Sequence, residues 1–466
     1  MRSFFHVIKS LPVILILITS IVQLPSAYAE KPLLDSIQDL DKRFQALSYE
    51  VHKSSSKRAA KFAQIEQLAA RFESIRQEHV NIAIQLILGN LELIKNNALH
   101  PVIIDIYRFL LQHNCTTLAD EILAIIQQTG DEINLAKARL HDAKFLASNH
   151  RWLKVIQQLT DINDTLEKED AAYANLLKGT ALQQLKQHRL AIKAYQDIPA
   201  DSIQKIYAEL NTAIAYIRLG WLSDARKKID TLDQSPAKTS DPELYNRLNL
   251  ILGYALLRKE FYRDARTTFR KVPLNSQYAS RALLGIALSA TNLGDYMSGL
   301  KALSQLKKLN TYDLPHDEAY LVLPLLYQKL EQPLSVASTY SEAVDYYQQR
   351  VNALTDLINN KNTIEDMIFD ARTGDIVIDQ MRLNFSQTYP PGFFENQKQL
   401  DPLAKAQGSK GFIKKIQELQ QAYRKTSKEL LTALLNERQK FLNSYLNQAR
   451  YGLARHFDNQ QRNEAQ

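Results

Sequence analysis

Glycine and cysteine are scarce in this chain. Of its 466 residues, 13 are glycine and one, Cys115, is cysteine. Glycine at about 3% is less than half the usual ~7%, which disfavours a turn-rich β-barrel or a fold built on glycine phosphate loops. A single cysteine excludes an internal disulfide and a thiolate metal cluster. Thr116 and the residues after it indicate a helix start, so we expect Cys115 to be a buried small apolar side chain rather than a reactive thiol.

Local catalytic and metal-binding motifs are also missing. The sequence has no His-Glu-x-x-His, no glycine-rich phosphate loop, no nucleophile elbow and no Cys-x-x-Cys. Its ten histidines are scattered, and His141 and His150 have only Asp142 as an acidic neighbour, which is typical of surface histidines. We therefore predict no catalytic residue, no metal site and no cofactor. A catalytic site assembled in space from distant residues stays open as an alternative.

What is present is ordinary globular composition, with 45% hydrophobic and 23% charged residues and a formal net charge of +8. This composition argues against a long disordered chain. The length fits two to four domains or one extended array.

Residues 1–29 have the order of a secretory signal. Two basic residues precede the apolar stretch LPVILILITSIV, and Ala27-Tyr28-Ala29 then provides a small-x-small cleavage site before Glu30. Twelve residues of helix span ~18 Å, which is too short for a ~30 Å hydrocarbon core. We predict export, with the bacterial periplasm as the destination. An uncleaved inner-membrane anchor is the alternative.

The middle of the chain repeats itself. In each repeat a small residue is followed by a second small residue twelve positions later and by a bulky residue four positions after that. The four strong units start 34, 40 and 34 residues apart, and weaker copies start at Tyr107, Ala143 and Pro324. In the strong units the three positions are Gly179, Ala191 and Tyr195; Ala213, Ala225 and Ile229; Gly253, Ala265 and Phe269; and Ala287, Gly299 and Leu303.

This spacing predicts stacked helical hairpins. Small residues in both helices of a pair allow close approach, and the bulky residue one turn later fills the groove between them. A single hairpin cannot bury its apolar face, so neighbouring hairpins must stack and share a core.

These residues resemble the tetratricopeptide-repeat superfamily over roughly 100–345, most strongly over 171–305. The resemblance is carried by Leu252-Gly253, Ala255, Ala265 and Phe269 in one unit, and by Ala213, Tyr216, Leu219-Gly220, Ala225 and Leu293-Gly294-Asp295-Tyr296 in others. The early tryptophan of the family is absent, and the closing proline comes about four residues early, at Pro199 and Pro273. The resemblance implies a helical-repeat solenoid that binds a protein or peptide in its concave groove.

The two ends of the chain lack the repeat spacing. Residues 30–98 predict two or three helices that form a cap on the array of 99–334. Residues 335–466 predict a long antiparallel coiled-coil hairpin, because apolar residues recur at nearly 3.5-residue spacing on both sides of a breaker-rich loop at 373–409. With arms near 335–372 and 410–458, Val351 should lie level with Leu430. The predicted fold class is therefore all-α.

Charge and aromatic residues in the C-terminal part leave two pairs of alternatives open. The basic residues of the last helix, among them Lys410, Lys414, Lys415, Arg424, Lys425, Lys428, Arg438 and Lys440, either attract an anionic polymer or membrane, or form a solubilising face beside the acidic first arm. The aromatic-proline cluster of the loop either is a docking epitope or packs back onto the helices. That cluster consists of Tyr389, Pro390, Pro391, Phe393 and Phe394.

These features together predict a non-catalytic, exported scaffold that binds a protein or peptide partner in the bacterial cell envelope. The alternative is an accessory factor for envelope assembly or polysaccharide export that contacts an anionic polymer or membrane through its basic C-terminal helix. Nucleic acid is not expected as a partner, because the signal directs the chain away from it. The sequence leaves the oligomeric state open.

Overall fold

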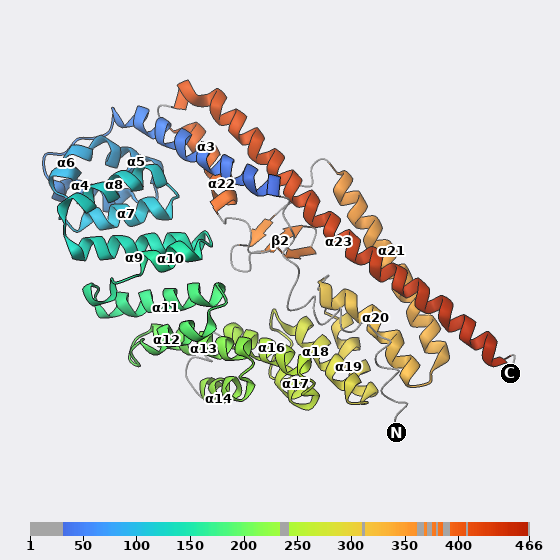
Figure 1. Cartoon of the computed structure of the whole chain (residues 1–466). Helices are drawn as coiled ribbons and strands as arrows, with labels where there is room; N and C mark the ends of the chain where they lie inside the picture. The colour runs from blue at the N-terminus through green and yellow to red at the C-terminus, as the bar shows by residue number, and fades with distance from the viewer. Residues whose placement is uncertain are drawn as a thin grey trace. The chain divides into compact units, whose positions relative to one another are not determined.

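The computed structural model describes residues 31–233, 242–309, 313–360, 368–370, 375–378, 381–384, 392–406 and 409–464 (Figure 1). The predicted signal at 1–29 lies outside these residues. The chain forms two compact units. The first unit comprises Ala29–Ala208 and Gln387–Leu430, and the second comprises Glu209–Ser386 and Leu431–Gln466.

The first unit begins with four helices that lack the repeat spacing: α3 (Lys31–Ser56), α4 (Ile65–Ile75), α5 (Val80–Gly89) and α6 (Leu91–Asn96). The buried face of α4 shows why this segment is helical, since Ile65, Leu68, Phe72 and Ile75 recur at spacings of three and four. These helices share one core with the first repeats. Four helices stand where two or three were predicted.

Helix pairs make up most of both units. The first unit holds α7 (Val102–Gln112) with α8 (Thr116–Thr129), α9 (Glu132–Ser148) with α10 (Trp152–Gln158), and α11 (Lys168–Gln184) with α12 (His188–Gln196), besides a short 3-10 helix η1 (Asn163–Thr165). The second unit holds α13 (Gln204–Leu219) with α14 (Leu222–Asp233), α16 (Pro242–Arg258) with α17 (Tyr262–Phe269), α18 (Ala279–Asn292) with α19 (Tyr296–Lys307), and α20 (Leu314–Lys329) with α21 (Pro333–Asn359).

A left-handed residue joins the two helices of every one of these pairs. The residues with positive φ at these turns are Asn114, His150, Lys186, Gly220, Glu260, Gly294 and Glu331. Each lies seven positions after the start of one repeat as read from the sequence, so the 34- to 40-residue period of the sequence is the period of the structure. The all-α helical-repeat fold is thus confirmed.

Glu260 is the turn position at which a change to glycine should stabilise the protein. Its φ is 64°, where a side chain costs roughly 1 kcal/mol. We expect Glu260→Gly to raise the free energy of unfolding by about 0.5 kcal/mol after the extra chain entropy of glycine is subtracted. Urea denaturation measures this. Lys259→Gly, at a neighbour without positive φ, should lower the same quantity. A loss of stability in Glu260→Gly equal to that in Lys259→Gly would contradict the argument.

The segment predicted as a breaker-rich loop at 373–409, together with the residues just before it, contains short strands and helices. Three short strands, β1 (Ile368–Asp370), β2 (Asp375–Ile378) and β3 (Met381–Asn384), form an antiparallel sheet in the order β1-β2-β3. They pair Phe369 with Ile376, and Ile376 with Leu383. Helix α22 (Gly392–Lys405) and the short helix η2 (Ser409–Phe412) follow. The glycines and prolines of this segment led to the prediction of a loop. In the structure, short strands and helices occur among them.

The C-terminal arms pair antiparallel, as predicted, but in a different register. The first arm is α21, and the second is the later part of α23 (Ile413–Glu464), as Figure 1 shows in orange and red. Gln439 donates to Thr355 at 2.8 Å, and Arg450 donates to Gln348 at 2.8 Å. Val351 therefore lies level with residues between 439 and 450, and its predicted alignment with Leu430 was wrong.

The register differs because the first part of α23 has other neighbours. Residues up to Leu430 belong to the first unit, where Tyr423 packs against Phe393 of α22 with ring centroids 5.0 Å apart and Ser427 donates to Gln397 of α22 at 2.9 Å. The first arm also ends at Asn359, earlier than the predicted 372. Only the second half of α23 is left to pair with α21.

The end of α23 takes the place of a further repeat's first helix. Gly452 lies so close to the ring of Tyr340 in α21 that an added Cβ would overlap it. The same relation holds between Gly285 of α18 and Phe269 of the preceding pair. A helix from the end of the chain therefore covers the last repeat in the way that each repeat covers the one before it.

A buried polar cluster fastens α23 to α20. Arg438 forms an ion pair with Asp317, which is fully buried. Tyr346 donates to the other carboxylate oxygen of Asp317 at 2.6 Å, and Tyr445 donates to Glu318 at 3.3 Å. Burial, and then the neighbouring Asp317 carboxylate, raise the pKa of Glu318 to about 8. Apolar contacts tolerate small shifts of a helix, whereas these hydrogen bonds and the ion pair form only at one position. The cluster therefore fixes the position of α23 against α20.

Candidate functional site

A groove lined by arginines crosses the first helices of three successive pairs in the second unit. Arg218 comes from α13, Arg247 and Arg258 come from α16, and Arg281 comes from α18. The groove holds a cavity of about 210 Å³. Its other lining residues are largely apolar or aromatic: Ile217, Leu250, Ile251, Tyr254, Ala255 and Tyr278.

The repeat places these arginines together. Arg247 and Arg281 each lie thirteen residues before the left-handed turn residue of their pair, Glu260 and Gly294. Arg218 and Arg258 each lie two residues before theirs. Residues at equivalent positions of stacked helices lie on the same face, so two repeat positions produce four guanidinium groups along one groove.

The four guanidinium groups have no anionic partner among the residues that the structure describes, and all four side chains are exposed. Loss of surrounding water, and then the positive charges of Arg258 and Arg247, lower the pKa of Arg218. Basic side chains near the groove but outside it do have acidic partners: Arg266 pairs with Asp295 at 2.7 Å, and Lys271 pairs with Asp230 at 3.1 Å. Like charges gathered without a counter-charge favour the binding of an anion.

Tyr254 fixes the floor of the groove. Its hydroxyl donates to the backbone oxygen of Arg281 at 2.6 Å, and its ring lies edge-on to Phe269 with centroids 4.8 Å apart. Phe269 is fully buried under Gly253 and Gly285. The packing of small residues around a bulky one thus holds the helix that carries Arg281 at a fixed distance from α16. A guanidinium presents a planar fork of donors that matches carboxylates and phosphates, so the groove can bind an anionic group beside an apolar one.

The repeat positions read from the sequence pack inside the helix pairs, and none of them lines the groove. Gly179 faces the ring of Tyr195, and Gly253 faces the ring of Phe269, each too closely for a Cβ. Gly299 approaches the backbone of Ala287. The other positions are almost wholly buried: Ala191, Ala213, Ala225, Ile229, Ala265 and Leu303. They hold the helices of their pairs together, whereas the arginines line the groove.

Only part of the aromatic-proline cluster belongs to the described residues. Tyr389, Pro390 and Pro391 lie outside the described residues. Phe393 and Phe394 are 2% and 5% exposed in α22. Both side chains are packed inside the first unit, with Phe393 against Tyr423 of α23.

The basic C-terminal helix keeps most, but not all, of its predicted basic face. Lys414, Arg424 and Lys428 are exposed, as are Lys410, Lys415, Lys425 and Lys440. Arg438 is not part of that face, because it is buried against Asp317. Its place in the helical pattern, at an apolar spacing between Leu431 and Tyr445, is the signal that could have distinguished it.

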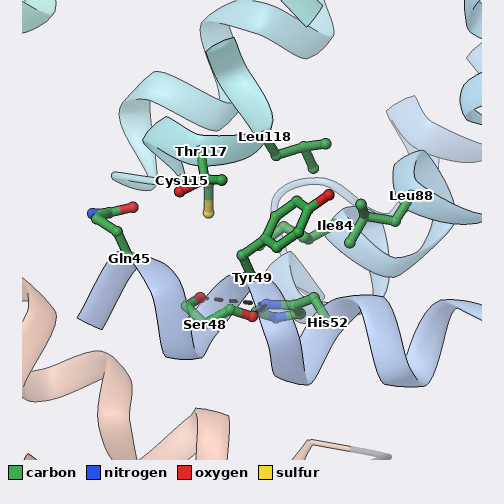
Figure 2. Close-up of a pocket in the computed structure, with 9 residues that line it drawn as sticks. All are labelled: Gln45, Ser48, Tyr49, His52, Ile84, Leu88, Cys115, Thr117 and Leu118. Carbon is green, nitrogen blue, oxygen red and sulfur yellow. Dashed lines mark hydrogen bonds between the residues drawn. The ribbon is translucent and has the colours of Figure 1, made fainter. Parts of the chain in front are cut away.

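Figure 2 shows a second cavity, between α3, α5 and the start of α8. Ser48 and His52 lie 3.4 Å apart there, with Nε2 of His52 3.1 Å from Oδ1 of Asn81, but the space is about 10 Å³, enough for one water molecule. Burial lowers the pKa of His52 and raises that of the half-buried Cys115 thiol to about 12. This histidine, serine and cysteine line a packing gap that admits no substrate. In the described parts of the chain no three His, Cys, Asp or Glu side chains gather as metal ligands.

Sequence reasoning missed the arginine groove. The signal was present as equal spacing, because Arg247 and Arg281 are separated by the 34 residues of their repeat and Arg218 and Arg258 by the 40 of theirs. Residues that line a groove follow the repeat period without belonging to its packing template. Among the described residues, no helix combines the length and apolar character needed to cross a bilayer.

No protein-family model and no curated protein matches the sequence. Among solved structures, a tetratricopeptide repeat protein from Parabacteroides merdae is similar over 62% of this chain and 99% of its own, with 14% identity and a TM-score of 0.35. The apo form of the quorum sensor NprR from B. thuringiensis is similar over 73% and 97%, with 14% identity and a TM-score of 0.36. A signal transduction ATPase with a tetratricopeptide repeat sensor, from Pyrococcus horikoshii, is similar over 86% and 65%, with 13% identity and a TM-score of 0.33.

Sequence identities and TM-scores this low carry no information about function. The fold follows instead from the geometry of the chain itself. Seven helix pairs stand among the described residues, each with a left-handed residue at its turn. In the best-formed pairs a small residue packs against a bulky aromatic ring of its own pair or of the pair before it. These features make the chain a helical-repeat protein built of stacked helix pairs, the fold that its resemblance to tetratricopeptide repeats implies.

Proposed function

We propose that this protein is an exported, non-catalytic scaffold that holds a protein or peptide partner of the bacterial cell envelope in the arginine groove. The groove is the observation that supports this proposal. It joins four guanidinium groups, which have no anionic partner in the described parts of the chain, to an apolar floor on the first helices of stacked repeats. Stacked repeats of this kind create extended binding surfaces. A mixed apolar and cationic lining suits a polypeptide with acidic and apolar side chains.

Crosslinking in living cells tests the proposal. A photoreactive amino acid at Ile251, which lines the groove, should crosslink to one or a few proteins that mass spectrometry can identify. The same amino acid at Thr267, exposed on the second helix of the same pair, serves as the matched control. Equal crosslinking patterns from the two positions would count against the groove as the binding surface.

The second candidate function is that of an envelope-assembly or polysaccharide-export accessory. It is favoured by the exposed lysines and arginine of residues 410–428, which lie on one stretch of the chain. Under this proposal, binding to anionic vesicles or polymer should weaken steeply with salt. Replacing Lys414, Lys425 and Lys428 by glutamine should weaken it further, whereas replacing Arg247 and Arg281 should not.

Export makes a separate prediction. If the segment of residues 1–29 is a signal, the mature protein in the envelope fraction should begin at Glu30. N-terminal sequencing of that fraction measures this. A chain that still begins at Met1 and sediments with membranes would show the uncleaved anchor instead.

A further inference from the structure

One repeat position of the second unit carries an arginine in two successive pairs and a carboxyl side chain in the third. The position thirteen residues before the left-handed turn residue is Arg247 in α16, Arg281 in α18 and Glu318 in α20. The two arginines line the groove with no anionic partner among the described residues. Glu318 is 1% exposed, because α23 covers it. The same face of the repeats is thus open at two pairs and occupied at the third.

The occupant at the third pair is a helix of complementary charge. Arg438 of α23 pairs with Asp317, and Tyr445, seven residues later on the same helix, donates to Glu318 at 3.3 Å. Leu431, Leu435 and Leu442 of this part of α23 are buried as well. An amphipathic helix that brings a basic group and apolar side chains therefore lies on the acidic member of the series.

The arginine groove has the corresponding features with the charge reversed. Leu250 and Tyr254 are buried, the half-buried Ile251 lies between them, and Arg247 and Arg258 flank these three residues along α16. Arg247 and Arg258 are eleven residues apart, which is ~16 Å along the helix, or about three turns. An extended polymer with charge on every unit would leave the half-buried Ile251 between them uncovered. A helix with carboxylates along one edge of an apolar stripe would cover both.

We propose that the groove binds an acidic amphipathic helix of the partner protein, in the manner in which α20 binds α23. This inference rests on the proposed function and names the form of the partner segment. The apolar stripe packs on the half-buried Ile251 and Tyr278, and the carboxylates pair with Arg247 and Arg281. Charge-assisted pairs of this geometry also set the direction in which the helix lies.

The test uses the full-length mature protein and two labelled peptides of one composition. The first peptide is an 18-residue helix of leucine, alanine, glutamate and glutamine, with glutamates spaced three and four residues apart along the edge of a leucine stripe. The second holds the same residues in an order that removes the stripe. Fluorescence anisotropy at physiological salt should give a Kd at least tenfold lower for the first peptide.

Variants locate the binding. The double substitution Arg247→Gln and Arg281→Gln should raise the Kd of the first peptide at least tenfold. Arg263→Gln with Arg270→Gln removes the same charge from exposed positions in and just after α17, and should change the Kd less than twofold. All four side chains are exposed, so the melting temperature of either variant should match that of the unmodified protein.

Three results would overturn the inference, and they bear differently on the proposed function. Equal affinity for both peptides, lost in the Arg247/Arg281 variant, would refute the helix but keep a peptide partner. Binding of heparin through these two arginines with no binding of either peptide would overturn the proposed function as well. No binding of peptides or heparin would refute the inference alone, since crosslinking from Ile251 tests the partner independently.

Discussion

Replacing Ala265 by arginine should lower the melting temperature of the protein by roughly 5–15 °C. Ala265 is fully buried on α17, the second helix of its pair. A large side chain there must force helices apart, which costs ~1–3 kcal/mol, and its charge would be buried without a partner. For a unit of this size each kcal/mol shifts the melting temperature by about 2–4 °C.

The matched control lies six residues away. Lys259 is exposed at the turn of the same pair, so Lys259→Ala should change the melting temperature by less than 2 °C, about what ~0.5 kcal/mol would produce. Calorimetry or circular dichroism measures both variants. Equal shifts in the two would mean that the repeat register is misplaced.

Replacing Glu318 by glutamine should remove a pH dependence of stability and raise the melting temperature at pH 8 by roughly 5 °C or more. Glu318 is buried beside Asp317, and its pKa is raised from the ordinary 4.5 to about 8. The charged groups around it are Asp317, Arg438 and Asp313, with Tyr445 as hydrogen-bond donor. Burial lowers the pKa of His316 at the start of α20.

The sign follows from proton binding in the two states. Between pH 4.5 and 8 the folded protein keeps the Glu318 proton and the unfolded chain has lost it. Folding therefore takes up a proton, and stability falls by up to about 1.4 kcal/mol for each pH unit. The stability that this group contributes is complete below pH 4.5 and is lost as the pH rises toward 8.

An amide cannot ionise, so Glu318→Gln should melt at nearly the same temperature as the unmodified protein at pH 5 and well above it at pH 8. Glu331→Gln, at an exposed turn residue of the same pair, is the control and should follow the unmodified protein at both pH values. Parallel melting curves for Glu318→Gln and the unmodified protein across this range would show that the buried cluster does not hold a proton.

The repeats were predictable because their period is local. Small residues such as Gly253 and bulky ones such as Phe269 recur at fixed spacing, and that spacing alone requires close helix pairs. The absent tryptophan and the early prolines, Pro199 and Pro273, did not affect this prediction. What positions each helix is the contact between a small and a large side chain, and both are visible in the sequence.

The C-terminal half was harder to predict because its contacts are long-range. The apolar pattern of α23 is continuous over 52 residues, and nothing local shows that its first part packs on α22 and only its second part on α21. Asp317 and Arg438 lie 121 residues apart, so their pairing leaves no spacing signal. The arginine groove differs from both, since its residues repeat with the helices but only the fold reveals that they share a surface.

The affinity of the crosslinked partner for the purified protein tests the central claim most directly. Once a partner has been identified from Ile251, its Kd should be measured for the unmodified protein, for Arg247→Gln with Arg281→Gln, and for Arg263→Gln with Arg270→Gln. The arginine groove predicts at least a tenfold weaker Kd for the first variant, about 1.4 kcal/mol, and no change for the second. Equal weakening in the two variants, or none in either, would contradict the claim that this groove binds the partner.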